Sequence, residues 1–151
     1  MKRKSLQGSV CAVARALDVI GDWWSLLIIY EAIAAPKRFG EFERNLGVAK
    51  NILATRLKAL LAEGIVEVSP ASDGSVYQEY VITRKGRALL PTLVALAQWS
   101  CEYLFDRREV RLVPLDAKRC RPLKKLVLHS ADGQLLDVGE IRIRTSRSLS
   151  R

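Results

Sequence analysis

The sequence of 151 residues has few of the residue types on which enzymes and metal proteins depend. Its three cysteines, Cys11, Cys101 and Cys120, are too few and too far apart for a disulfide framework or a zinc site. The single histidine, His129, has no cysteine or paired carboxylates near it and indicates neither a metal ligand nor a general base. We find no glycine-rich phosphate loop and no nucleophile elbow. We therefore expect a protein that is not an enzyme and that holds no cofactor and no metal.

Long hydrophobic runs are also absent. An apolar stretch at residues 26–35 is interrupted by Glu31 and is far shorter than a membrane span. Lys2, Arg3 and Lys4 are followed by polar residues instead of the apolar segment of a signal peptide. We therefore expect no membrane partner and a location in the reducing cytoplasm.

Positive charge is what the sequence has in excess. Lysine and arginine number 25 against 16 acidic residues, so the net charge is +9 and the sequence pI is near 9.8. Such a balance favours a polyanion such as nucleic acid as the partner. The excess is uneven, because residues 1–105 carry +3 and residues 106–151 carry +6. Bulk charge alone therefore does not locate a binding surface.

Hydrophobic side chains recur at helical spacing over the first part of the sequence. They predict a helix at residues 10–20 and a second helix at 23–35, which Asp22 caps and Pro36 stops. This second helix is apolar nearly all round, so we expect it at the buried centre of the domain. A third, short helix is predicted at residues 37–46.

The stretch that begins at residue 50 combines an apolar side with a polar side. The apolar positions share one helical face: Leu53, Leu57, Leu60 and Leu61. Gly64 stands where a glycine would end the helix, and Gly47 separates it from the helix before by a very short turn. A helix, a tight turn and a second helix predict a helix-turn-helix whose second helix faces outward.

Two predicted strands follow, at residues 65–69 and 76–82, with turn residues between them. A hairpin after a helix-turn-helix is a winged helix. Thr83 then caps a long helix, in which Pro91 predicts a kink or a restart.

The last third of the sequence changes character. Residues 123–129 and 134–144 predict a second hairpin, and the polar end at 145–151 is expected to be frayed. The predicted fold class is α+β and mostly helical. It consists of a winged helix-turn-helix domain at 1–105, with dimerisation helices at both of its ends, and a basic C-terminal extension at 106–151.

Several blocks of the sequence occur in an order that is typical of one family. They are 11-CAVARALDVIGDWWSLLII-29, 38-RFGEF-42, 46-LGVAKNILATRLKALLAEGIVE-67, 79-EYVITRKGRALLP-91 and Trp99. Together they resemble the HxlR-type bacterial transcription regulators, collinearly over residues 10–104. The resemblance implies a homodimer that pairs through its first and last helices and binds palindromic operators in double-stranded DNA. It also implies control by oxidants, quinones or aldehydes in some members, while the effector of this protein stays open.

Individual residues can be matched to the family pattern. Asn51 and Arg56 match its recognition helix, Arg38 matches the entry to the helix-turn-helix, and Cys11 matches a cysteine that some members use as a redox sensor. The sequence also departs from the pattern. Tyr30 and Tyr77 stand where many members have arginine, and Ala12 replaces a proline.

The polar side of the predicted recognition helix supplies candidates for reading base edges: Lys50, Asn51 and Thr55. An amide can bond adenine bidentately, and a threonine offers a hydroxyl or a methyl group. The alternative is an ordinary solvated surface. The candidate contacts in the wing are Ser75, Tyr77 and Gln78.

Cations at the margins of this surface are candidates for the DNA backbone: Arg38, Arg56 and Lys58. A phosphate contact needs no base code and contributes salt-dependent affinity. Arg56 lies at the flank of the buried leucines, so the alternative for it is to bury its stem and pair with a carboxylate such as Glu31 or Glu41.

Cys11 lies near the start of a predicted helix, where the helix terminus and nearby cations favour the reactive thiolate. It is therefore a candidate redox sensor. The alternative is that its thiol is buried and behaves as a small hydrophobic side chain.

These observations predict a sequence-specific DNA-binding transcriptional regulator, a repressor that acts as a homodimer on an inverted-repeat operator. The alternative is a winged-helix module that binds protein or RNA, because the fold does not dictate the partner. A DNA reader loses affinity steeply with salt and still prefers one duplex, whereas a protein-binding module shows neither property.

Overall fold

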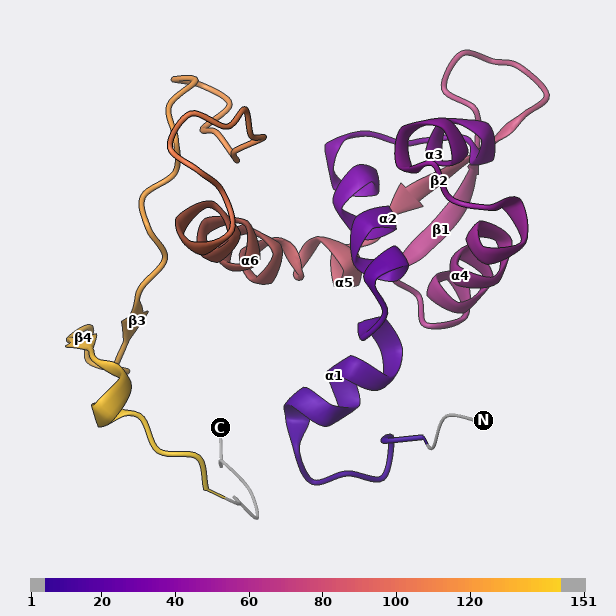
Figure 1. The fold of residues 1–151 in the computed structure, drawn as a ribbon. Coiled ribbons are helices and arrows are strands. Elements are labelled where there is room, and N and C mark those ends of the chain that lie inside the picture. Colours follow the sequence, from indigo (N-terminus) through magenta and orange to yellow (C-terminus); the bar gives the residue numbers. More distant parts are fainter. Residues whose placement is uncertain (1–4, 145–151) are drawn as a thin grey trace. The chain divides into compact units, whose positions relative to one another are not determined.

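The protein is mostly helical in the computed structural model, which describes residues 5–144. In chain order the elements are α1 (Ala12–Ile20), α2 (Trp23–Ala34), α3 (Phe39–Leu46), α4 (Lys50–Ala62), β1 (Val66–Pro70), β2 (Gln78–Ile82), α5 (Arg84–Arg87), α6 (Leu90–Tyr103), β3 (Leu128–His129), β4 (Leu135–Leu136) and the 3₁₀ turn η1 (Val138–Glu140) (Figure 1). The end that we predicted to be frayed, residues 145–151, lies outside the described residues.

The chain divides into two compact units, of which the first ends at Leu93 and the second begins at Val94. The first unit holds α1 to α5, the β1–β2 sheet and the start of α6. The second holds the rest of α6 and the C-terminal segment. The predicted division into a domain at 1–105 and an extension at 106–151 stays a prediction, because contact density within the chain does not test which parts form separate domains.

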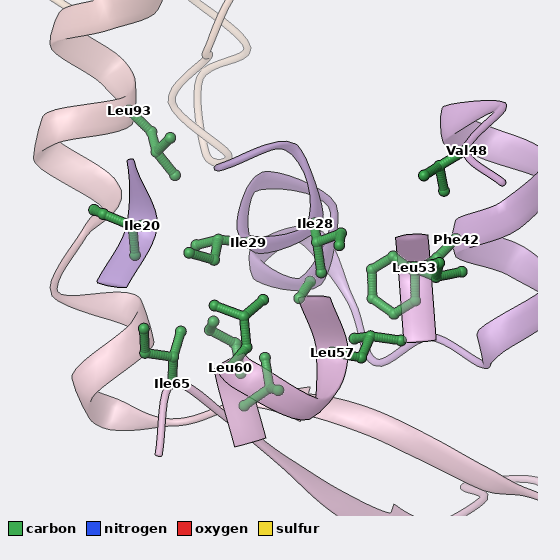
Figure 2. Close-up of a cluster of buried hydrophobic side chains, with 13 residues drawn as sticks. Ile20, Ile28, Ile29, Phe42, Val48, Leu53, Leu57, Leu60, Ile65 and Leu93 are labelled. Atoms are coloured by element: carbon green, nitrogen blue, oxygen red, sulfur yellow. The ribbon is translucent and has the colours of Figure 1, made fainter. Parts of the chain in front are cut away.

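Helix α2 is the centre of the first unit and contacts α1, α3, α4, α5 and β2 (Figure 1). Its side chains Ile28 and Ile29 are fully buried. In Figure 2 they lie within a cluster that also contains Phe42, Leu57 and Leu60, from α3 and α4. The centre of the domain was therefore predicted correctly.

One side of α2 is exposed, although its sequence is apolar nearly all round. Trp23 is 76% exposed, and Leu27 and Tyr30 are also exposed. The neighbouring helices and the small sheet cover the side of Ile28 and Ile29, whereas no element among residues 5–93 covers the opposite side. An apolar sequence alone could not show on which side the cover would be missing.

Helix α4 has the predicted leucine side, since Leu53, Leu57 and Leu60 are at most 1% exposed. The helix ends as predicted at Gly64, whose φ of +63° is left-handed. The Ile65 N–H donates to Leu60 O (2.9 Å), and the Gly64 N–H donates to Leu61 O (3.0 Å). This pair of bonds satisfies two carbonyls at the helix end and directs the chain into β1.

The turn between α3 and α4 is held by one glycine and one buried side chain. Gly47 has φ +62° and donates its N–H to Glu43 O at 3.0 Å. Val48 follows and is 3% exposed, in the same cluster as Leu53 (Figure 2). The turn therefore fixes how α4 leaves α3, as a helix-turn-helix requires.

Strands β1 and β2 form an antiparallel hairpin, with Val66 opposite Ile82 and Pro70 opposite Gln78. The second strand is shorter than predicted, because the chain from residue 71 to 77 forms the wing tip. Lys37 and Tyr80 exchange two backbone hydrogen bonds, of 3.1 and 2.8 Å, which join the segment that leads into α3 to β2. These elements make a winged helix-turn-helix, and they confirm the predicted fold class.

The helix after the wing restarts, as Pro91 led us to expect. The hydroxyl of Thr83 accepts a hydrogen bond from the Gly86 N–H (3.1 Å) and caps α5. That helix ends at Arg87, and α6 begins at Leu90. Pro91 lies in the first turn of α6, where the missing N–H of a proline leaves no helical bond unmade.

The C-terminal hairpin lies where it was predicted, but its arms are much shorter. Only Leu128 pairs with Leu136 and His129 with Leu135. The second arm was expected to continue to residue 144. It turns into η1 instead, because the Glu140 carboxylate accepts the Asp137 N–H (2.8 Å) and caps that turn.

The left-handed conformation of Gly64 leads to a stability prediction. Gly64→Ala should destabilise the protein by about 1–2 kcal/mol, because an L side chain is unfavourable at positive φ. The measurement is the free energy of unfolding in urea.

Gly40→Ala is the matched control, since Gly40 lies inside α3 and a Cβ there would meet no atom within 4 Å. That change should instead stabilise the protein by about 0.5–1 kcal/mol, through helix propensity. Equal effects of the two changes would contradict the role given to Gly64.

Candidate nucleic-acid interface

The outward side of α4 carries the polar residues predicted to read bases. Lys50, Asn51, Thr55 and Lys58 are all exposed, on the side of α4 opposite its buried leucines. The Thr55 hydroxyl donates its proton to Asn51 O at 2.7 Å. Thr55 therefore presents a methyl group and a hydroxyl oxygen that can only accept. The Asn51 side-chain amide makes no hydrogen bond to any of the residues that the structure describes, so its donors and its acceptor remain for a bidentate contact.

The two lysines of this side differ in their surroundings. Lys50 Nζ lies 3.9 Å from Glu43 Oε1 of α3, although the lysine is largely exposed. Lys58 has no ion pair with any residue in the part of the chain that the structure describes. Lys58 is therefore the more available cation for a phosphate.

Arg56 joins α4 to the start of α2. Its Nε lies 3.1 Å from Asp22 Oδ1, and Asp22 also caps α2 by accepting the Ser25 N–H at 3.0 Å. Arg56 therefore forms an ion pair, as the alternative prediction held, but its partner is Asp22 and not Glu31 or Glu41. Glu31 instead lies 3.5 Å from Lys37 Nζ.

Glu41, the other carboxylate considered for Arg56, caps α3. It accepts the Arg38 N–H at 2.7 Å. Asp22 was predicted as a helix cap, but nothing in the local pattern places it beside α4, because that contact depends on the packing of α2 against α4.

Arg38 is held by the tip of the wing. Its Nη2 lies 2.5 Å from Asp73 Oδ2 and donates to the Ser75 hydroxyl at 3.0 Å. The guanidinium also lies over the Tyr77 ring, 5.1 Å from the centroid. The hydrogen bond to Asp73 raises the pKa of Arg38 above its ordinary value. Two candidate wing contacts, Ser75 and Tyr77, thus touch a candidate backbone contact.

Asp73 is the acidic partner in this cluster. Hydrogen bonds from Ser75, followed by the one from Arg38, lower the pKa of Asp73 from 3.8 to about 2. Glu79 lies deeper, with 8% of its surface exposed, and accepts the Ser72 N–H at 3.2 Å. Sequence reasoning did not find the pairing of Arg38 with Asp73, which lies 35 positions away on the other side of the helix-turn-helix. The third wing candidate, Gln78, is exposed in β2 opposite Pro70.

Cys11 is exposed at the N-terminal cap of α1, and its N–H donates to the Ser9 hydroxyl at 3.1 Å. The alternative of a buried thiol is therefore wrong for the single chain. Cys120 is also exposed and has a positive φ of 51°, whereas Cys101 is half-buried.

Two searches of the described residues bear on other kinds of site. Between residues 5 and 144, no group of three or more histidine, cysteine or acidic side chains is arranged to hold a metal ion. No helix in this range has the length and apolar character needed to cross a membrane.

Comparison with known proteins gives a consistent family. Residues 19–108 match the family model described as HxlR-like helix-turn-helix. Rv3095 of Mycobacterium tuberculosis, named an uncharacterized HTH-type transcriptional regulator, is 41% identical over 93 residues. That match covers 62% of this chain and 59% of Rv3095, so it spans about three fifths of the length of each protein.

Two solved structures show the similarity in three dimensions. The crystal structure of PA1607, described as a candidate transcription factor, has a TM-score of 0.87 and 43% identity, over 96% of this chain and all of that one. The redox regulator HypR in its oxidized form has a TM-score of 0.56 and 33% identity, over 66% of this chain and all of that one. The match to PA1607 therefore extends into the C-terminal segment.

The cluster at the wing tip leads to a titration prediction. The pKa of Asp73 should be about 2 in the folded protein, and Ser75→Ala should raise it toward 3.8. A lowered pKa means that Asp73 contributes stability above the pKa of the unfolded chain, and that this contribution is lost as the pH falls toward 2. The measurement is the carboxyl carbon shift by NMR. A pKa that stays near 2 in Ser75→Ala would contradict the assigned cause.

Proposed function

This chain belongs to the HxlR-like helix-turn-helix family, and from that premise we propose that it is a repressor that acts as a homodimer on an inverted-repeat operator. It is a helix-turn-helix transcriptional regulator, and double-stranded DNA is the partner of this class. Its place of action is then the cytoplasm, where bacterial DNA is found.

One observation carries the proposal for DNA reading. The second helix of the helix-turn-helix buries a full row of leucines and leaves Asn51, Thr55 and Lys58 on its open side. A helix of this diameter fits the major groove, in which base edges have distinct patterns of donors and acceptors. Asn51 and Thr55 are the proposed discriminating residues, and Lys58 the proposed phosphate contact. Lys50 extends this surface at the start of the helix.

The arginines near this surface have a different role in the proposal. Arg38 and Arg56 remain backbone contacts, but each is paired with an aspartate in the free protein. A phosphate would therefore have to replace a carboxylate, so each should contribute less affinity than an unpaired cation of equal charge.

Exposed apolar rows support the proposed homodimer. In α1, Val13 is 66% and Leu17 46% exposed, four residues apart on one side of the helix. In α6, Trp99 is 51% exposed and contacts Tyr103, with ring centroids 5.9 Å apart and ring planes tilted by 40°. Such rows are normally covered in a soluble protein. A second copy covers the same rows on both chains when the pair is related by a two-fold axis.

The exposed thiol of Cys11 supports a response to oxidants, quinones or aldehydes. Cys11 occupies the N-cap position of α1, one of the helices proposed for the dimer interface, so a modified thiol would change that contact. HypR, a similar protein, is described as a redox regulator. We propose Cys11 as the sensing residue of this chain.

The DNA-reading proposal is tested by selecting duplexes from a random pool at near-physiological salt. Enrichment of an inverted repeat with half-sites about one helical turn apart is the expected result. On the selected operator, Thr55→Ala should relax the preference at one base position by about 1–3 kcal/mol. Lys58→Ala should instead weaken binding to all sequences alike and reduce the salt slope by about 1.

These two variants serve as controls for each other. An unchanged preferred sequence in Thr55→Ala would show that α4 does not present this side to the bases. Failure to enrich any duplex would favour the alternative of a protein- or RNA-binding module.

The sensing proposal predicts that a quinone or peroxide lowers the operator affinity of the wild type and leaves Cys11→Ser unaffected. Cys120→Ser is the matched control, because Cys120 is a second exposed thiol and its loss should leave the response intact. The measurement is operator binding by fluorescence anisotropy before and after treatment. Equal responses of wild type and Cys11→Ser would exclude Cys11 as the sensor.

A further inference from the structure

The tip of the wing is tied to the start of α3 through one guanidinium group. Arg38 immediately precedes α3, and its Nη2 reaches both Asp73 Oδ2 (2.5 Å) and Ser75 Oγ (3.0 Å) at the tip. The Ser75 N–H in turn donates to Asp73 Oδ1 at 3.0 Å. Figure 1 shows the loop of the wing on the same side of the first unit as α3. The tip therefore presents a carboxylate to the cation at the entry to the helix-turn-helix.

The two carboxylates around Arg38 are not equivalent. Glu79 is nearly buried, lies 3.8 Å from Arg38 Nε and is bound by the Ser72 N–H. Its position is fixed by β2 and the turn. The Asp73 side chain is 56% exposed and lies at the surface, where a solvent ion or a phosphate can also reach Arg38. Asp73 is thus the partner that an incoming phosphate would replace.

A shallow hollow of about 680 Å³ opens beside this pair. Charged side chains of both signs line it: Arg38, Glu41, Arg44, Asp73 and Glu79. A phosphate that approaches Arg38 through the hollow therefore meets carboxylates as well as cations. An exposed ion pair contributes little stability to the fold, so its main effect is on the electrostatic potential at the surface where a charged ligand binds.

We propose that Asp73 sets the strength of DNA binding by competing with a backbone phosphate for Arg38. The inference rests on the proposed placement of DNA against α3 and α4. The competition acts on every duplex alike, because phosphates carry no sequence information. Asp73 thereby lowers binding to bulk DNA and leaves discrimination to the outward side of α4.

The test is Asp73→Asn in the full chain, which keeps the size of the side chain and removes its charge. Affinities for the selected operator and for a scrambled duplex are measured by anisotropy at several salt concentrations. Both should rise several-fold by a similar factor, and the slope of log K against log salt should steepen by at most about 0.9, the value for one full phosphate contact, because Arg38 already makes part of that contact in the wild type. The melting temperature of the variant checks that its fold is kept.

Two further variants identify the cause. Glu67→Gln makes the same change in net charge at an exposed position of β1. Glu67 has no ion pair in the described part of the chain, so this change should give a much smaller gain in affinity. In Arg38→Ala, the added change Asp73→Asn should give no more than the small gain of Glu67→Gln. A full gain that persists without Arg38, an equal gain from Glu67→Gln in the wild type, or no gain from Asp73→Asn would overturn the inference. Wild type that binds no duplex in a salt-dependent way would overturn the proposed DNA binding itself.

Discussion

The packing of the α4 leucines against α2 is the contact on which the rest of the molecule depends. Leu53, Leu57 and Leu60 are buried, and α2 supplies Ile28 and Ile29 to the same cluster. Removing one such leucine side chain would leave a cavity and remove about 2–5 kcal/mol of stability. Because one side of α4 is committed to this contact, its opposite side must face outward. The interior thus decides which residues can meet a ligand.

The same packing decides what happens to the cations. Asp22 caps α2, and because α2 and α4 are in contact it also reaches Arg56. Arg38 is held in a similar way by Asp73, which is far away in the sequence and reaches Arg38 only in the folded protein. The positive charge that the sequence suggested for the binding surface is therefore largely paired. On the outward side of α4, within residues 5–144, the Asn51 amide and the Lys58 ammonium have no side-chain partner, and the Thr55 hydroxyl, which donates to Asn51 O, keeps its oxygen as an acceptor.

Much of the fold follows from local patterns in the sequence. The period of the leucines, the position of Gly64 and the capping side chain of Thr83 each predicted an element that the structure contains. Contacts between elements could not be predicted in this way. The partner of Arg56 was expected on the wrong carboxylates, because residues 34 positions apart in sequence meet only when α2 and α4 pack. The second arm of the C-terminal hairpin was overestimated, because the Glu140 carboxylate accepts the Asp137 N–H and this local bond competes with strand pairing.

The hydrophobic pattern of α1 shows why periodicity cannot distinguish a core from an interface. The apolar row that predicted this helix ends in Ile20, which is buried, and includes Val13 and Leu17, which are exposed. A row that is buried within one chain and a row that is covered by a second chain have the same period, because both cover one side of a helix. Exposure in the folded chain is the additional information that separates them. In α1 it changes within a few residues, so the helix begins with exposed apolar side chains, which the proposed homodimer would cover, and ends in the core of its own unit.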